Sequence, residues 1–364
     1  MIGTAEYNFL GKTRILFSVD DFKSARWTDE LIRYNTEVLP SGAHTYSEIL
    51  AILKGFVKRQ RVHLFVFRYL NDHRTFRRSL KYLIRDTLII LISNLLGTRI
   101  LWVMHNVDRE TVCYHPRLNR LRRMMIQKGA ERILVTDPHL LPIAEDFGVS
   151  RNKLGWTCFG PPKPREVDLE NKKLKKEIGQ FREHLQSEGF DSVYLGLCAS
   201  KAAEKKNHYL KAHTVVGASD ENKKSCVGLI MVGNFPKGPD FEIAKEEVID
   251  SPFILYIEQS LSVNEAYIQD EIDFFYRSMT DQSVAYTLYV ACKLDKPVFT
   301  HNTGALPVIV EKEEIGWVIR TVRDVPGFIS RNLQNWNPLG SKRFLSKRNW
   351  HTGAVNIYKT IKTG

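Results

Sequence analysis

The sequence has few cysteines, no long apolar run and no low-complexity tract, and each absence excludes a class of protein. Its five cysteines are scattered and form no CxxC pair, so we expect neither a disulfide framework nor a zinc site, and a reducing cytoplasm is the expected compartment. The densest apolar run, residues 88–92, ends at Ser93 and Asn94, which predicts that no helix spans a membrane. The first twenty residues lack the pattern of a secretory signal.

The remaining composition is that of a folded protein with hydrophobic cores. Of the 364 residues, 43% are hydrophobic and 26% are charged. This balance excludes a disordered, collagen-like or coiled-coil chain, and the length suits two domains of ordinary size.

Positive charge is concentrated in the first half of the chain. Residues 1–165 hold 27 basic and 15 acidic residues, whereas the rest of the chain holds 26 of each. Such an uneven distribution predicts that the first half meets an anionic surface. Nucleic acid and the anionic inner leaflet of a membrane are both candidates on this evidence.

Short β-rich runs alternate with helical stretches along both halves. Strands are expected at residues 14–19, 62–67, 100–104, 133–135, 192–198, 227–232, 253–256, 273–276, 297–300 and 317–320. Helices are expected at 74–96, 118–128, 166–188, 267–272 and 284–292, and near the C-terminus. This alternation predicts an α/β protein with two Rossmann-like, doubly wound domains that face each other across a cleft.

The prolines at positions 161, 162 and 164 mark the expected domain boundary. We expect an N-terminal domain over residues 1–160, a linker and charged helix over 161–190, and a second domain over 191–340. A C-terminal helix over 341–364 is expected to pack back on the first domain. Because ligands bind at the carboxyl ends of parallel strands, the residues after each strand are the candidates for chemistry.

Three polar segments follow predicted strands. Lys201 and Lys206 lie five positions apart before a helix, a spacing that can converge on a diphosphate, and an ordinary solvated loop is the alternative. Residues 280–283 open the predicted helix 284–292 and can hold a phosphate or a sugar, with ordinary helix caps as the alternative. Residues 105–110 offer an imidazole and two carboxylates where a general base is needed, although a lone His105 is more often structural.

Several of these segments resemble motifs of GT-B glycosyltransferases that build bacterial exopolysaccharides and lipid-linked glycans. The strand-to-loop motif of that family is similar to residues 102–106, WVMHN. Its diphosphate-gripping loop is similar to residues 200–207, and its donor-site helix and following loop are similar to residues 276–307. The resemblance covers nearly the whole chain, in the right order. It implies a donor site made of Ser200, Lys201, Lys206, Tyr276, Arg277, Gln282, Ser283, Thr303 and Gly304.

The sequence departs from the family pattern at defined positions. Where common retaining members place two glutamates, this chain has Gln282 and Val290, which favours inversion of the sugar's configuration. Asp20 and Asp21 replace the glycine-rich loop after the first strand. No DxD metal motif is present, and the resemblance implies a metal-independent hexosyltransferase that needs no cofactor beyond its nucleotide-sugar donor.

The mechanism that the resemblance implies follows from charge. Lys201 and Lys206 would offset the negative charge that grows on the leaving diphosphate. The acceptor hydroxyl needs a base from the first domain, for which Asp108, Glu110 and Asp20 are the candidates. His105 would contact the transferred sugar or orient the base.

Two basic clusters in the first half form the candidate acceptor or membrane surface. They comprise Arg74, Arg77, Arg78, Lys81, Arg85, Arg120 and Arg123. Solvated outer faces of helices are the alternative interpretation. An anionic leaflet attracts each nearby Lys or Arg by about 1 kcal/mol, so we expect this domain to dock peripherally on the inner membrane face, beside a glycan or lipid-linked acceptor.

Two other functions fit parts of the pattern. A nucleotide-sugar epimerase would share the architecture but gains nothing from a basic first domain. A nucleic-acid-binding protein would use that domain, yet the sequence shows no helix-turn-helix, zinc or aromatic RNA-binding signature and leaves Lys201 and Lys206 unexplained. We therefore expect no nucleic-acid partner.

Overall fold

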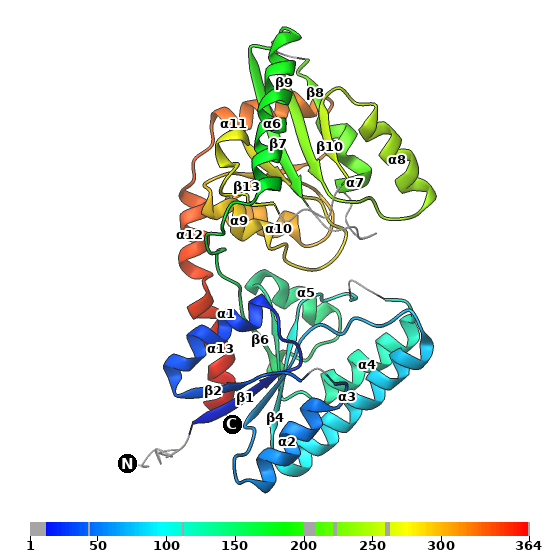
Figure 1. The fold of residues 1–364 in the computed structure, drawn as a ribbon, viewed down its shortest axis with the longest axis vertical. Coiled ribbons are helices and arrows are strands. Elements are labelled where there is room, and N and C mark those ends of the chain that lie inside the picture. The colour runs from blue at the N-terminus through cyan, green and yellow to red at the C-terminus, as the bar shows by residue number, and fades with distance from the viewer. Residues whose placement is uncertain are drawn as a thin grey trace. The chain divides into compact units, whose positions relative to one another are not determined.

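A computed structural model describes residues 12–42, 44–110, 113–199, 208–220, 224–258 and 263–362. The chain forms two compact α/β units (Figure 1). The first comprises Met1–Gly160 with Arg348–Gly364, and the second comprises Pro161–Lys347. The charged helix that we assigned to a linker belongs to the second unit, and the chain returns to the first unit at Arg348, later than the expected position 341.

The first unit contains a six-stranded, fully parallel sheet in the order β2-β1-β3-β4-β5-β6. Its strands are β1 (Thr13–Phe17), β2 (Thr36–Leu39), β3 (Leu64–Phe67), β4 (Arg99–Met104), β5 (Arg132–Val135) and β6 (Leu154–Trp156). Every residue of β3 is buried, as expected for a parallel strand with both faces covered.

Helices cover both faces of this sheet. They are α1 (Phe22–Leu31), α2 (Ser47–Val57), α3 (Phe76–Leu96), α4 (Pro116–Gly129), α5 (Leu141–Asp146) and α13 (Trp350–Lys362). α1 and α13 pack together on one face, and α2, α3 and α4 lie side by side on the other (Figure 1). Local signals set the helix ends: the Asp21 side chain caps α1, Pro116 begins α4, and Gly97 ends α3 in the left-handed conformation.

The second unit contains a seven-stranded sheet in the order β10-β9-β7-β11-β12-β13, with β8 paired antiparallel to β9. Its strands are β7 (Ser192–Ala199), β8 (Gly217–Ala218), β9 (Ser225–Val232), β10 (Ile254–Ile257), β11 (Phe274–Tyr276), β12 (Val298–His301) and β13 (Gly316–Ile319). Its helices are α6 (Leu169–Ser187), α7 (His208–Lys211), α8 (Pro239–Ile249), α9 (Thr287–Lys293), α10 (Leu306–Lys312), α11 (Val325–Gln334) and α12 (Leu339–Lys347).

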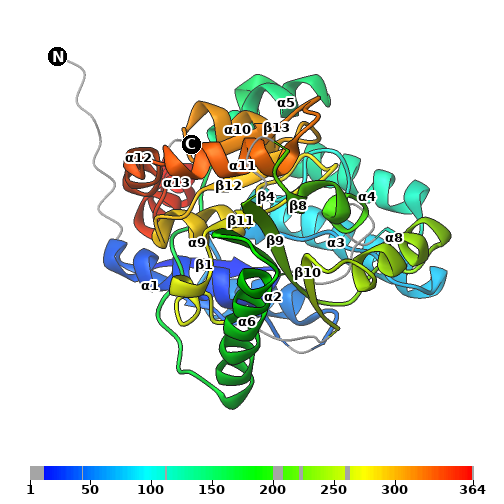
Figure 2. The same cartoon turned by 90° about the horizontal axis from the view of Figure 1, so that it is seen from above.

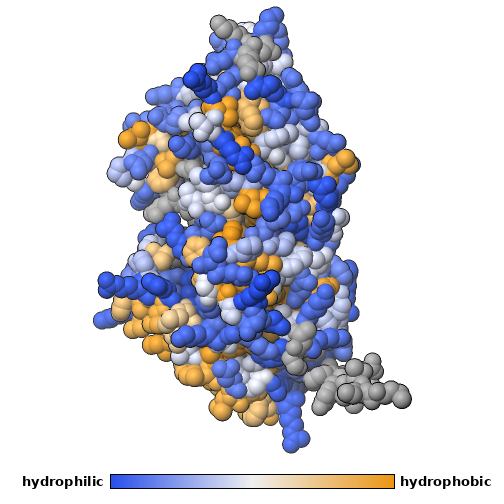
Figure 3. Space-filling view, turned by 180° about the vertical axis from the view of Figure 1, so that it is seen from behind, coloured by the Kyte–Doolittle hydropathy of each residue, from blue (hydrophilic) through white to orange (hydrophobic). Residues whose placement is uncertain are grey.

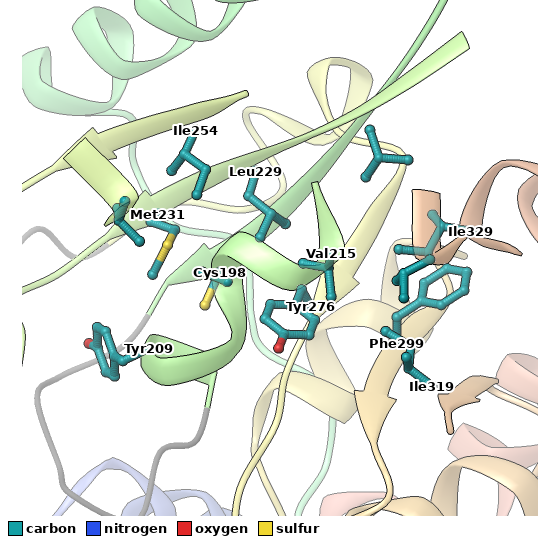
Figure 4. Close-up of a cluster of buried hydrophobic side chains, with 14 of the residues drawn as sticks. Cys198, Tyr209, Val215, Leu229, Met231, Ile254, Tyr276, Phe299, Ile319 and Ile329 are labelled. Carbon is teal, nitrogen blue, oxygen red and sulfur yellow. The ribbon is translucent and has the colours of Figure 1, made fainter. Parts of the chain in front are cut away.

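The two faces of this second sheet are covered by different helices. α7, α8 and α11 contribute to a cluster that includes Tyr209, Leu229 and Ile329 (Figure 4). α6 covers the other face, where the missing side chain of Gly228 makes room for Phe181 and Leu185. Figure 2 shows α6 and α11 on opposite sides of β9. Both faces of the sheet are therefore packed, as in a doubly wound domain.

Some elements differ from the sequence-based expectation. The helix expected from residue 284 begins at Thr287, and the helix expected over 267–272 is only the short 3-10 turn Gln269–Glu271. The elements α1, β2 and α2 are absent from the sequence-based expectation. Within the described part of the chain, none of the helices combines the length and apolar character that a bilayer crossing requires.

Candidate functional site

The carboxyl edge of the first sheet gathers polar and aromatic side chains from four strand ends. Lys23 follows β1, Arg68 and Tyr69 follow β3, His105 follows β4, and Phe159 follows β6. Parallel strands place these ends at one edge, and the contacts below show that the side chains meet there.

Arg68 is the centre of this cluster. It is fully buried and forms an ion pair with Asp21, and its guanidinium lies 5.0 Å from the ring centre of Tyr69. Its Nε donates to Nε2 of His105 at 3.4 Å, while Nη2 has no partner among the described residues. Burying a cation in this way requires compensation, and one of its donors remains available.

His105 is held as a neutral ring. It stacks on Tyr69 with 4.0 Å between ring centres and lies nearly parallel to Phe159 at 5.7 Å. Burial lowers its pKa well below the usual value, and the charges of Arg68 and Lys23 act in the same direction. An Nε2 that accepts from Arg68 leaves the proton on Nδ1, so this imidazole orients neighbouring groups better than it removes a proton.

Lys23 is a second cation at this edge and is half-buried. Burial lowers its pKa from 10.5 to about 8, and the charge of Arg68 contributes. Its Nζ donates to the Tyr69 hydroxyl at 3.1 Å and lies 4.0 Å from the centre of the Phe159 ring. Burial would also raise the pKa of Asp21, but Arg68 and Ser24 outweigh burial and lower it.

The candidate bases differ in their surroundings. Asp108 lines a pocket of about 580 Å³ together with Arg109, Asn119 and Arg120. Glu110 is buried. It forms a 2.6 Å ion pair with Arg123 and accepts a hydrogen bond from the backbone N–H of Leu70. Both oxygens of its carboxylate are thus engaged within the protein, so Glu110 does not fit the role of the base. Asp20, the third candidate, is exposed after β1.

Two cations that we assigned to the basic surface also have structural roles. Arg85 is buried and pairs with Asp86 at 2.7 Å, and the same carboxylate accepts from Arg122 at 2.5 Å. Arg123 is occupied by Glu110. The expectation that Arg85 lies on an exposed face is therefore wrong, because its side chain is buried against Asp86, whose carboxylate also binds Arg122 of α4. Arg74, Arg77, Arg78, Lys81 and Arg120 are exposed.

The carboxyl edge of the second sheet holds a further buried arginine. Arg277 directly follows β11, and its Nη1 donates to the carbonyl of Ala199, the last residue of β7, at 3.4 Å. The side chain is 9% exposed, and its Nε has no partner among the described residues. Burial lowers the pKa of Arg277, while the charge of Asp281 acts against this shift. Ser200, Lys201 and Lys206 follow Ala199 in the chain but lie outside the described residues.

Two loops beside Arg277 are joined to each other. The Thr303 hydroxyl donates to the carbonyl of Met279 at 3.1 Å. Gly304 adopts a φ of +68°, and a Cβ at this position would lie 2.5 Å from the carbonyl oxygen of Asp281. Ser283 is buried and donates to Asp281 at 2.8 Å. Residues 280–283 thus form part of a structured loop ahead of α9, and the expectation that they open the helix is wrong.

The remaining donor-site candidates differ in accessibility. Tyr276 is fully buried in the hydrophobic cluster of the second unit (Figure 4), and burial raises the pKa of its hydroxyl well above the usual value. Its ring therefore contributes to the core. Gln282 is partly exposed in the loop, whereas Val290 is buried in α9.

No protein-family model and no curated protein matches this sequence. Solved structures, however, match nearly its whole length. A glycosyltransferase from Rickettsia africae is similar to this chain with a TM-score of 0.61 and 12% identity, covering 97% of this chain and 99% of that one. HepE from Anabaena, solved with UDP and glucose, has a TM-score of 0.59 at 12% identity, covering 97% and 100%. Sucrose-phosphate synthase from Thermosynechococcus elongatus has a TM-score of 0.56 at 12% identity, covering 96% and 98%.

The chain has the GT-B fold. Within this GT-B chain, the structure brings His105 together with three residues that sequence reasoning missed, namely Arg68, Lys23 and Tyr69. Arg68 and Tyr69 directly follow the predicted strand 62–67, so the rule that chemistry lies after strands already pointed to them. Lys23 had no such signal. Among the described residues, no cluster of His, Cys, Asp or Glu has the arrangement of a metal site.

Proposed function

We propose that this protein is a glycosyltransferase that moves a sugar from a nucleotide-diphosphate donor to a glycan or lipid-linked acceptor. The observation that carries the proposal is Arg277, a nine-tenths buried cation at the carboxyl edge of the second sheet of a GT-B chain. The solved structures of similar fold include HepE in complex with UDP-glucose, a nucleotide sugar, which supports the same class of donor.

Arg277 suits the diphosphate of such a donor. It adjoins the end of β7, from which residues 200–207 continue, so Lys201 and Lys206 would add their charges to the same group. A guanidinium binds phosphate oxygens through paired N–H donors, and its charge offsets the negative charge of the leaving group. Thr303 and Ser283 shape the neighbouring loops. Gln282, which adjoins Ser283 and is partly exposed, is a further candidate for contact with the donor.

The transfer step follows from this assignment. The acceptor oxygen forms a bond to the anomeric carbon while the bond from that carbon to the diphosphate oxygen breaks. The nucleoside diphosphate leaves with the electron pair, and the proton of the acceptor hydroxyl passes to a carboxylate of the first unit. We assign this base to Asp108, which lines a pocket, with exposed Asp20 as the second candidate.

We further propose that the reaction transfers a hexose, inverts its configuration, requires no metal, and serves polysaccharide synthesis in the cytoplasm. Gln282 and Val290 supply no carboxylate at the donor site, which favours a single displacement with inversion. All five cysteines are free thiols, which suits a reducing compartment.

The decisive experiment measures the protection of the protein by nucleotides. The midpoint of thermal unfolding is followed with UDP, ADP, GDP or dTDP, and a ligand at 100 times its dissociation constant adds about 2.7 kcal/mol to the free energy of unfolding. Arg277→Met and, separately, Lys206→Ala should remove most of the response to the correct nucleotide. Arg343→Met changes an exposed arginine on α12 and should keep the full response.

Product analysis then separates the two enzyme classes. Incubation with the matching nucleotide sugar should release nucleoside diphosphate, slowly with water and faster with a glycan acceptor. Release of none, together with a change in the sugar of the intact donor, would indicate an epimerase. An unchanged nucleotide response in Arg277→Met would remove that residue from the donor site.

A further inference from the structure

The outer face of α2 and α3 exposes large apolar side chains that no other element covers within the described chain. On α2 they are Leu50, Leu53, Phe56 and Val57, and on α3 they are Ile84, Leu88, Leu91 and Leu95. We call these eight residues the apolar ridge. Val57 is 80% exposed and Leu95 is 83% exposed. Figure 3 shows hydrophobic residues gathered along the lower left of the first unit, the side on which α2–α4 lie.

The ridge is continuous because the two helices run side by side in the same direction. α2 connects β2 to β3 and α3 connects β3 to β4, all strands of one parallel sheet, and the two helices pack against each other. Lys81, near the start of α3, lies 5.4 Å from the ring centre of Tyr46, which precedes α2. Arg61, after α2, lies next to Gly97 at the end of α3. The exposed stripes of the two helices are therefore in register.

The ridge on α3 is not the face that holds the helix on the protein. Its members recur at spacings of four, three and four residues, which places them on one side of the helix. Leu83, Asp86 and Ile90 occupy the opposite side and are buried. α3 thus has one apolar face packed in the core and a second apolar face directed outward, which a solvated helix does not need.

The charges around the ridge have one sign. The only carboxylates on α2 and α3 belong to Glu48 and Asp86, and both are buried. Exposed cations lie on these helices and on the segment after α2: Lys54, Lys58, Arg59, Arg61, Arg77, Arg78 and Lys81. Arg77 and Lys81 extend the same stripe as Ile84 and Leu88 toward the start of α3.

We propose that the apolar ridge inserts into the surface of an anionic lipid bilayer, with the surrounding cations on the lipid headgroups. An amphipathic surface of this kind sinks about 5–10 Å, to the boundary between headgroups and acyl chains. The cations select an anionic bilayer, because each gains attraction from the negative surface potential. A second copy of this chain fits poorly, since a symmetric contact through the ridge would bring two sets of cations together.

The apolar ridge changes the expected salt dependence of membrane attachment. Attachment by charge alone would be lost in high salt, whereas inserted leucines hold the protein after the charges are screened. This proposal rests on the proposed transfer to a lipid-linked acceptor and adds a membrane-binding surface to it. Vesicle binding, however, needs no donor sugar. Failure of the membrane contact and failure of the transferase are therefore separately visible.

The test is flotation of the full-length protein with vesicles. Vesicles of phosphatidylcholine and phosphatidylglycerol in equal parts are compared with vesicles of phosphatidylcholine alone. The protein should float with the anionic vesicles and retain part of its binding in 1 M salt. Leu91→Gln with Leu95→Gln should lower the partition coefficient at least about tenfold. Arg77→Gln with Lys81→Gln should lower it at low salt and have little effect at high salt.

Ile243→Gln with Ile249→Gln is the matched control, because it removes two exposed isoleucines from α8 in the second unit. This variant should bind vesicles as the unchanged protein does. Equal binding by the unchanged protein and by the Leu91→Gln, Leu95→Gln variant would overturn the proposal. So would a dimer in solution that this variant converts to a monomer, since the ridge would then be an interface between copies.

Discussion

At the scale of the residue, each sheet edge holds a buried arginine, and the first edge also holds the half-buried Lys23. Arg68 and Lys23 lie at the first edge, where Asp21 supplies the carboxylate that pairs with Arg68. Arg277 lies at the second edge. Buried charge lowers stability unless it is compensated, so such groups are concentrated where a ligand or a reaction uses them.

The shifted pKa of Lys23 predicts a pH-dependent effect of Lys23→Met on stability. Lys23 titrates near pH 8 in the folded protein against an ordinary value of 10.5. Between these values the unfolded chain holds a proton that the folded chain lacks, so stability falls as pH drops from 10.5 to 8 and the cost stays constant below pH 8. Lys23→Met should therefore stabilise the protein at pH 7, by on the order of 1–3 kcal/mol.

Urea unfolding of the variant and the unchanged protein measures this difference. The advantage of Lys23→Met should shrink steadily as the pH is raised from 8 toward 10. A difference that is the same at pH 7 and pH 10 would show that Lys23 is not protonated at a cost in the fold.

At the scale of the element, the second sheet edge depends on two loops held against each other. Thr303 bonds to the loop after β11, the backbone N–H of Ala305 donates to the carbonyl of Asp281, and Gly304 lies between them. The close approach needs a residue without a side chain, in a conformation that other residues rarely adopt. The position of these loops beside Arg277 is thus set by backbone geometry.

Gly304→Ala should destabilise the protein by more than about 2 kcal/mol, because the new Cβ would meet backbone carbonyls while adopting a positive φ. It should also weaken the nucleotide response, since the loops must separate. Gly179→Ala on α6 is the matched control: a Cβ there meets no atom within 4 Å, and alanine favours the helix by about 0.5–1 kcal/mol. Chemical unfolding curves of similar midpoint for both variants would refute this role for Gly304.

At the scale of the whole molecule, each unit has its own core, and the chain visits the first unit twice. The returning segment is anchored by Arg348, which pairs with Asp137 at 2.6 Å across 211 positions of sequence. Both side chains are nearly fully buried. α13 then packs on α1, and the Thr157 hydroxyl donates to the carbonyl of Gly353. The last residues of the chain thus belong to the stability of the first unit.

Arg348→Met should leave Asp137 buried without its partner and destabilise the first unit by about 3–5 kcal/mol. Hydrogen exchange locates the effect: amides of β4 and β5 should lose protection, while amides of β7 and β9 keep it. Arg343→Met removes an exposed ion pair with Glu314 and should cost less than about 1 kcal/mol. Equal loss of protection in both units of Arg348→Met would mean that they unfold together.

The sequence by itself determined the architecture and placed candidate residues at the ends of strands. Alternation of short β-rich runs with helices is a local property, and a parallel sheet follows from it because each strand must be followed by a crossover. The same logic placed His105 and Arg277 at strand ends, where the structure has them. The sequence also shows directly that the positive charge is concentrated in the first half.

Only the tertiary structure decided which side chains are free to act. Arg85 and Arg77 look alike in sequence, yet Arg85 is buried against Asp86 while Arg77 faces outward. Leu91 and Ile90 are adjacent, yet one belongs to the ridge and the other to the core. The reason is that burial depends on which helix face meets a neighbour. That neighbour is far away in sequence: Arg122, which completes the pairing of Asp86, lies 36 positions along the chain.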